Sequence, residues 1–155
     1  MFTLMNDIPE AEARRLLQRR TSCELDGDWS PEKTQPGTFA ISAGITDEDG
    51  VSTMMQVKLY FRRSQKTGIV RYVFSIFKRT PYSLERVYQL DVRQCKKKIK
   101  NLHDRSHEHI GNLKLQGADD WAHWEFKDVL AYFSSATNLT FSVGPVHPEH
   151  FELRS

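Results

Sequence analysis

Residues 51–61 read VSTMMQVKLYF, and this stretch decides the fold. Its side chains alternate with a period of two, which is typical of a half-buried β-strand. One face carries Val51, Thr53, Met55, Val57, Leu59 and Phe61, and the other carries Ser52, Gln56, Lys58 and Arg62. The stretch therefore predicts a long strand with one apolar face.

Strands are also predicted on both sides of this segment. Upstream, residues 37–45 lead into the turn around Asp49-Gly50, a pair that suits a hairpin. Downstream, residues 69–78 are rich in β-branched and aromatic side chains, and residues 84–92 alternate again. The sequence thus predicts an antiparallel meander.

Two helices are expected to flank this sheet. Asp7 and Glu10 have the spacing of a capping box, which predicts a helix over residues 9–20. Apolar residues recur at helical spacing from Phe126 to Phe133, which predicts a second helix over residues 125–136. The fold class expected is α+β, with a meander sheet of about four to six strands and one further edge strand beginning near Thr140. Residues 121–126 are read as a short strand.

The 155 residues are enough for a single domain, 1–155. Within it we expect an irregular connection over 21–36, a loop region rich in lysine, arginine and histidine over 93–120, and a tail over 144–155. No apolar run is long enough to cross a bilayer, and the opening residues lack the pattern of a secretory leader. Cys23 and Cys95 stand in no disulfide pattern, so a cytoplasmic protein without membrane contact is expected.

The formal net charge of +2 hides a strong division along the chain. Residues 1–50 carry −5, residues 51–107 carry +11 and residues 108–155 carry −4. Such a division either attracts an anionic partner to the basic middle or lets the acidic ends complement that middle within the molecule. The sequence leaves both interpretations open.

Three histidines fall within seven residues, at His103, His107 and His109. Imidazoles with pKa values near neutrality can pass protons as general acid and base, and neutral imidazoles can bind zinc. Asp91, Glu108 or His123 would complete a metal site. The simplest alternative is a solvated loop whose histidines only titrate.

A basic run lies directly before and within the histidine cluster. It comprises Arg93, Lys96, Lys97, Lys98 and Lys100, with Arg105 inside the cluster. Cationic side chains of this kind bind phosphate and stabilise the charge that builds on oxygen during phosphodiester cleavage. Together with the histidines as catalytic residues, the run predicts metal-independent RNA cleavage without a cofactor, with zinc as the alternative. A solvated face is the commoner role of such lysines.

Aromatic and basic side chains also interleave in the predicted sheet. The residues are Tyr60, Tyr72, Tyr82, Tyr88, Arg62, Arg63, Arg71 and Arg86. Bases of a nucleic acid can stack on such a surface, although cross-strand packing explains most pairs of this kind.

Between about Val57 and Phe133 the chain carries an aspartate at a strand end (Asp91), HxH followed by glycine (107–111), an aromatic-x-aromatic pair (Trp124 and Phe126) and a closing amphipathic helix. In these short motifs it resembles the TumE-like family of toxin–antitoxin toxins. The resemblance implies a toxin that acts on RNA or translation. The chain departs from the family where Val92 replaces the asparagine that follows the aspartate, and where the lysine run stands as an insertion.

The leading hypothesis is a toxin that cleaves RNA through His103, His107, His109 and Asp91, with a cognate antitoxin as partner. The second is a non-enzymatic inhibitor from a phage or mobile element, of the anti-CRISPR or nuclease-inhibitor type, whose acidic segments 24–32 and 47–49 imitate nucleic acid. The third is a nucleic-acid-binding module without catalysis. Pairing of a strand such as 51–61 across a homodimer is also open.

Overall fold

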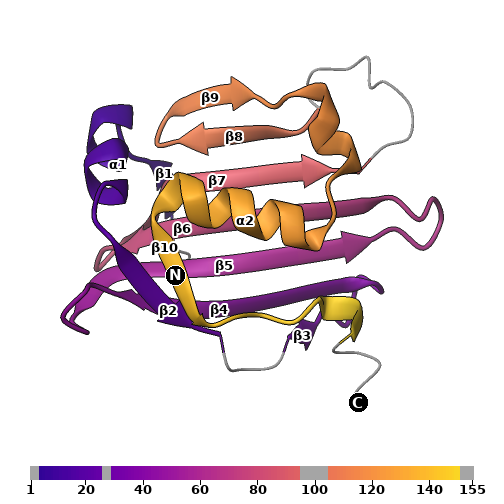
Figure 1. Ribbon diagram of the computed structural model, residues 1–155, viewed down its shortest axis with the longest axis horizontal. Helices are drawn as coiled ribbons and strands as arrows, with labels where there is room; N and C mark the ends of the chain where they lie inside the picture. The colour runs from indigo at the N-terminus through magenta and orange to yellow at the C-terminus, as the bar shows by residue number, and fades with distance from the viewer. Residues whose placement is uncertain (1–3, 26–28, 95–104, 151–155) are drawn as a thin grey trace.

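The computed structural model describes residues 4–25, 29–94 and 105–150. In these residues the fold is α+β, with one mixed sheet of ten strands (Figure 1). The predicted class is therefore confirmed, whereas four to six strands is an underestimate. The missed strands are only two to four residues long, too short to show a clear alternation.

Four long strands form the predicted meander at the centre of the sheet. They are β4 (Thr38–Thr46), β5 (Ser52–Arg63), β6 (Val70–Arg79) and β7 (Ser83–Arg93). Each pairs antiparallel with the next, so that Leu59 lies opposite Phe74 and Phe74 opposite Leu90. The alternation of apolar residues fixes this register, because a slip of one residue would turn every apolar side chain to the other face.

A hairpin of β8 (His107–Ile110) and β9 (Leu113–Gln116) extends the sheet beyond β7. Beside it, β1 (Leu4–Asp7) runs parallel to the first half of β7. The expected loop over 93–120 is therefore wrong for 107–116, where polar side chains concealed two strands. Gly111 has a φ of +56° in the hairpin turn, and a Cβ there would lie 2.4 Å from the carbonyl oxygen of Ile8. Only glycine fits this turn.

The other end of the sheet is formed by segments distant in sequence. β2 (Thr21–Glu24) pairs with β4, β10 (Leu139–Val143) runs parallel to β2 at the end of the sheet, and β3 (Ser30–Pro31) pairs with β4. The expected edge strand near Thr140 is confirmed. The expected irregular connection over 21–36 is wrong for β2 and β3, because turn-forming residues around them outweighed their own weak pattern.

The helix α2 (Phe126–Thr137) lies across one face of the sheet, and α1 (Glu10–Leu17) stands at one end (Figure 1). Both were predicted. The expected capping box at α1 is absent: Asp7 instead forms an ion pair with Arg86 at 2.8 Å. A capping box is found at α2, between Glu125 and Asp128. The short strand expected over 121–126 is wrong, since η2 (Asp119–His123) is a 3-10 helix that leads directly into α2.

The hydrophobic core lies between α2 and the apolar face of the meander. Phe126, Val129 and Phe133 of α2 are buried against aromatic side chains of β6 and β7. The Phe133 ring lies 5.7 Å from Phe74 and 5.8 Å from Tyr88. This packing fixes α2 on the sheet and leaves the opposite face of β4–β7 without a helix in the described part of the chain.

The beginning of the predicted tail is tied to the core. Trp29 Nε1 donates to the carbonyl oxygen of Val146 at 2.9 Å, and the His147 ring lies against Phe126 at 5.2 Å. Arg63 binds both carboxylate oxygens of Glu149, at 2.6 and 2.7 Å. Residues 144–150 therefore pack on the domain. None of the described helices is long and apolar enough to span a bilayer.

Candidate functional site

The face of the sheet turned away from α2, here called the open face, collects polar side chains in three rows that cross the strands. The first row is Arg62, Arg71 and Arg93. The second is Tyr60, Val73, Asp91, His107 and Gln116. The third is Lys58, Ser75, Gln89, His109 and Lys114.

These rows carry five basic residues and one acid, Asp91. Arg71 lies directly opposite both Arg62 and Arg93 on the neighbouring strands. Like charges placed opposite each other destabilise a sheet unless an opposite charge lies close to them, and Asp91 supplies that charge for Arg71 and Arg93. The open face is thus an electropositive surface with an aromatic ring, Tyr60, beside its arginine row.

Asp91 organises the centre of the open face. Its carboxylate accepts two bonds from Arg71, with Nε at 3.1 Å and Nη2 at 2.7 Å, and Arg93 Nε lies 3.8 Å away. Because the Asp91 side chain is only 5% exposed, these contacts replace its hydration. The bond to Asp91 raises the pKa of Arg71. The two parallel bonds to Asp91 thus fix the orientation of the Arg71 guanidinium.

His107 lies opposite Asp91 on β8 and is nearly buried. Its Nδ1 lies 2.9 Å from the carbonyl oxygen of Arg105, so Nδ1 carries a proton and donates it to that oxygen. Nε2 then points to Asp91 Oδ2 at 3.8 Å, which is too long for a hydrogen bond. A second proton, on Nε2, would create an ion pair with Asp91.

His109 contacts His107 edge to face, with the ring centroids 5.0 Å apart. Desolvation by burial and then the positive charge of Arg86 lower the pKa of His109 to about 4. His109 is therefore neutral at pH 7, and its ring can accept a proton. His109 is thus the more accessible, neutral imidazole, and it contacts the buried imidazole of His107 beside the Asp91 carboxylate.

Glu108, between the two histidines in sequence, points to the opposite face. Its carboxylate accepts a hydrogen bond from Tyr88 at 2.6 Å and bonds from Tyr132 at 3.0 and 3.1 Å. Burial, with Glu108 as a further cause, raises the pKa of Tyr132 to about 12, so its hydroxyl stays a donor. Glu108 therefore links β8 to α2, and it does not complete a site with His107 and His109.

The structure brings together three of the four predicted catalytic residues: Asp91, His107 and His109. The fourth, His103, lies outside the described residues, and so do Lys96, Lys97, Lys98 and Lys100 of the predicted phosphate-binding run. Arg105 is described, and its main chain holds His107. No group of three or more histidine, cysteine or acidic side chains suited to a metal ion occurs in 4–25, 29–94 and 105–150. A zinc site that includes His103 stays a prediction.

The predicted aromatic and basic surface is only partly assembled. Tyr72 and Tyr88 are buried in the core beneath α2, and Tyr82 is exposed in the turn between β6 and β7. Only Tyr60 shares the open face with Arg62 and Arg71. Sequence reasoning missed Lys58 and Lys114 as members of this surface, although their alternation with apolar neighbours was a usable signal.

One acidic segment proposed as a nucleic-acid mimic has a local structural role. Asp47 Oδ1 accepts bonds from the main-chain N–H groups of Asp49 and Val51, at 2.9 and 3.0 Å. Its other carboxylate oxygen lies 3.8 Å from Arg19. Asp47 therefore shapes the turn between β4 and β5.

No family model, curated protein or solved structure matches this chain.

Proposed function

We propose that the protein binds single-stranded nucleic acid on the open face of its sheet. The observation that carries the proposal is the row of Arg62, Arg71 and Arg93 across three adjacent strands, with Tyr60 in the next row. An extended phosphate backbone is a polyanion that offsets the repulsion within such a row. This is the third of the functions that the sequence predicts, now assigned to a surface.

The charges favour phosphate as the ligand. Arg62 and Lys58 of β5 are exposed, and neither has an acidic partner among the residues that the structure describes. Arg71, although bonded to Asp91, keeps a side chain that is 40% exposed. Its guanidinium is held in a fixed plane and still presents N–H groups to solvent, which suits a phosphate oxygen.

The shape of the surface favours a single strand over a duplex. A sheet face offers a broad platform on which unpaired bases lie flat, and no described helix projects from it to enter a groove. Tyr60 is half-buried on the open face, so part of its side chain is exposed to solvent. A base stacked on it would add about 1–3 kcal/mol of binding free energy.

Fluorescence anisotropy with a labelled RNA of about 12 nucleotides tests the proposal. With three to four phosphate contacts, the affinity should fall roughly 20- to 50-fold between about 50 and 200 mM salt. The double variant Lys58→Glu/Arg62→Glu should abolish most of the binding. The matched control Lys33→Glu/Lys66→Glu makes the same charge change at exposed lysines outside the three rows and should bind like the parent protein. Equal loss in both variants, or a flat salt response, would overturn the proposal.

Metal-independent RNA cleavage is the second candidate, favoured by the contact between His107 and His109 beside the basic rows. His109 would take the proton from a ribose 2′-hydroxyl, whose oxygen then attacks the adjacent phosphorus. The bond from phosphorus to the 5′-oxygen would break, and a His107 protonated on Nε2 would donate that proton to the leaving oxygen. The products are a 2′,3′-cyclic phosphate and a free 5′-hydroxyl. The toxin assignment depends on this reaction.

Incubation of the protein with labelled RNA, with and without EDTA, separates the two candidates. If the protein cleaves RNA through His109, the His109→Ala variant should form no product, while its RNA affinity in the anisotropy titration should change little. His109 is the appropriate position, because His107 is nearly buried and its replacement also disturbs the fold. If no product forms under any condition, the cleavage candidate is rejected and the binding proposal is unaffected. If RNA does not bind at all, a protein partner of the inhibitor type takes its place.

A further inference from the structure

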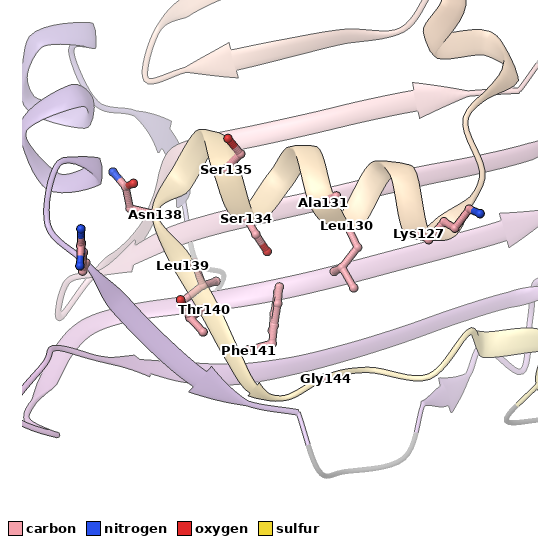
Figure 2. Close-up of a pocket in the computed structure, with 11 residues that line it drawn as sticks. Lys127, Leu130, Ala131, Ser134, Ser135, Asn138, Leu139, Thr140, Phe141 and Gly144 are labelled. Atoms are coloured by element: carbon pink, nitrogen blue, oxygen red, sulfur yellow. The ribbon is translucent and has the colours of Figure 1, made fainter.

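A groove lies on the other side of the molecule, in the angle between α2 and β10. It has a volume of about 700 Å³ and begins where β10 leaves the end of α2 at Asn138 (Figure 2). One wall is a stripe along α2, and the other is β10 itself. The residues of the helical stripe are Lys127, Leu130, Ala131, Ser134, Ser135 and Asn138.

The wall formed by β10 is an unpaired strand edge. In the described residues, β10 ends the strand order and has β2 as its neighbour. Thr21 N–H donates to the carbonyl oxygen of Asn138 at 3.1 Å, in the register that pairs Leu139 with Thr21. Alternate residues of a parallel strand bond to the same neighbour, so the main-chain groups of Phe141 point away from β2. Such groups pair readily with another extended chain.

The side chains of the groove indicate what that chain would carry. Leu130 and Phe141 are half-buried and present apolar surface inside the angle. Among the residues that the structure describes, the charged ones that line the groove, Arg20 and Lys127, are both basic. An extended segment with small apolar side chains flanked by acidic ones complements both features.

We infer that this groove binds an acidic, extended peptide of a partner protein, which adds to β10 as a further strand. Main-chain hydrogen bonds to β10 would supply part of the affinity. Every second side chain of the peptide would contact Leu130 and Phe141. The charges at Arg20 and Lys127 select against basic segments and against pairing of β10 with β10 of a second copy, which would bring like charges together. The groove lies on the α2 side of the sheet, so this inference is independent of the open face.

The probe is a heptapeptide in which glutamate alternates with valine, added to the ¹⁵N-labelled protein. Amide shifts are expected in β10 and in the α2 stripe. Arg20→Glu/Lys127→Glu should weaken binding about tenfold or more, and Lys33→Glu/Lys66→Glu should change it less than about twofold. A peptide N-methylated at its central valine should also bind at least about tenfold more weakly, because it cannot complete the main-chain ladder.

Four results would overturn the inference. They are shifts outside the groove, equal binding of a lysine–valine peptide, equal binding of the N-methylated peptide, and β10 shifts that appear on raising the protein concentration alone. The last would identify a second copy as the occupant. Because none of these readouts uses RNA, failure here is distinguishable from failure of nucleic-acid binding.

Discussion

The two faces of the central sheet are built from the same strands but differ in chemistry: one is apolar and buried, and the other carries polar and charged side chains. Neighbouring residues of β5 illustrate this: Phe61 is fully buried against Tyr72 and His147, whereas Tyr60 lies half-buried beside Arg71 on the open face. The covered face gains its stability from apolar burial. The open face brings three arginines together around one acid, Asp91, and the proposed polyanionic ligand would offset the repulsion left between them.

The largest effect is expected from comparing two aromatic truncations on β5. Phe61→Ala should destabilise the protein by about 3–5 kcal/mol, because it opens a cavity in the core. Tyr60→Ala should cost about 1 kcal/mol or less and should weaken RNA binding instead. Urea unfolding and anisotropy measure both quantities. A similar loss of stability in both variants would show that the open face is not the accessible surface described here.

Glu108 and Asp91 are buried carboxylates on opposite faces of the sheet, and Glu108 gives the next prediction. Glu108→Gln removes the charge that accepts bonds from Tyr88 and Tyr132, so stability should fall by about 1–3 kcal/mol while RNA affinity stays the same. The measurement is the urea midpoint together with the RNA titration. A changed RNA affinity would mean that the bonds of Glu108 to Tyr88 and Tyr132 also determine the structure of the open face.

Acidification should weaken the fold through His109. Its pKa is about 4 when folded and about 6.5 when unfolded. The unfolded state therefore binds more protons between these values, so stability is full above about pH 6.5, falls as the pH falls, and stops falling below about pH 4. The lowered pKa of His147 acts in the same direction. Urea unfolding at pH 7 and pH 5 should show a smaller difference in His109→Gln than in the parent protein, and an equal difference would contradict the assignment.

The smallest effect concerns Asp91, the lone acid of the three rows. Asp91→Asn frees Arg71 and Arg93 from its charge, so RNA should bind roughly three- to tenfold more tightly at low salt. The salt dependence should become steeper as well. Weaker binding would mean that Asp91 is needed chiefly to orient Arg71.

Periodicity made the large elements predictable. The meander and α2 follow from alternation in β4–β7 and from helical spacing after Phe126, since burial on one face imposes both patterns. The hairpin of β8 and β9 was not predictable in this way. His107 and His109 lie on the open face, and Glu108 is satisfied by two tyrosines, so no apolar alternation marks the strand.

The candidate site was predictable only in part. Asp91, His107 and His109 were recognised from residue type, and pairing of β8 with β7 brings them together. Arg62 and Arg71 were recognised as basic residues of the sheet and Arg93 as part of the basic run. Their alignment in one row was not predictable, because turns separate them and they become neighbours only through the register. Tyr72 and Tyr88 were misassigned because their aromatic rings serve the core equally well.

The most direct test of the central claim is to map the amide shifts of the ¹⁵N-labelled protein on addition of single-stranded RNA. Shifts are expected along the three rows on β5, β6, β7 and β8, centred on Tyr60, Arg62 and His109, with α2 and β10 unaffected. Shifts confined to α2 and β10, with the open face silent, would contradict it.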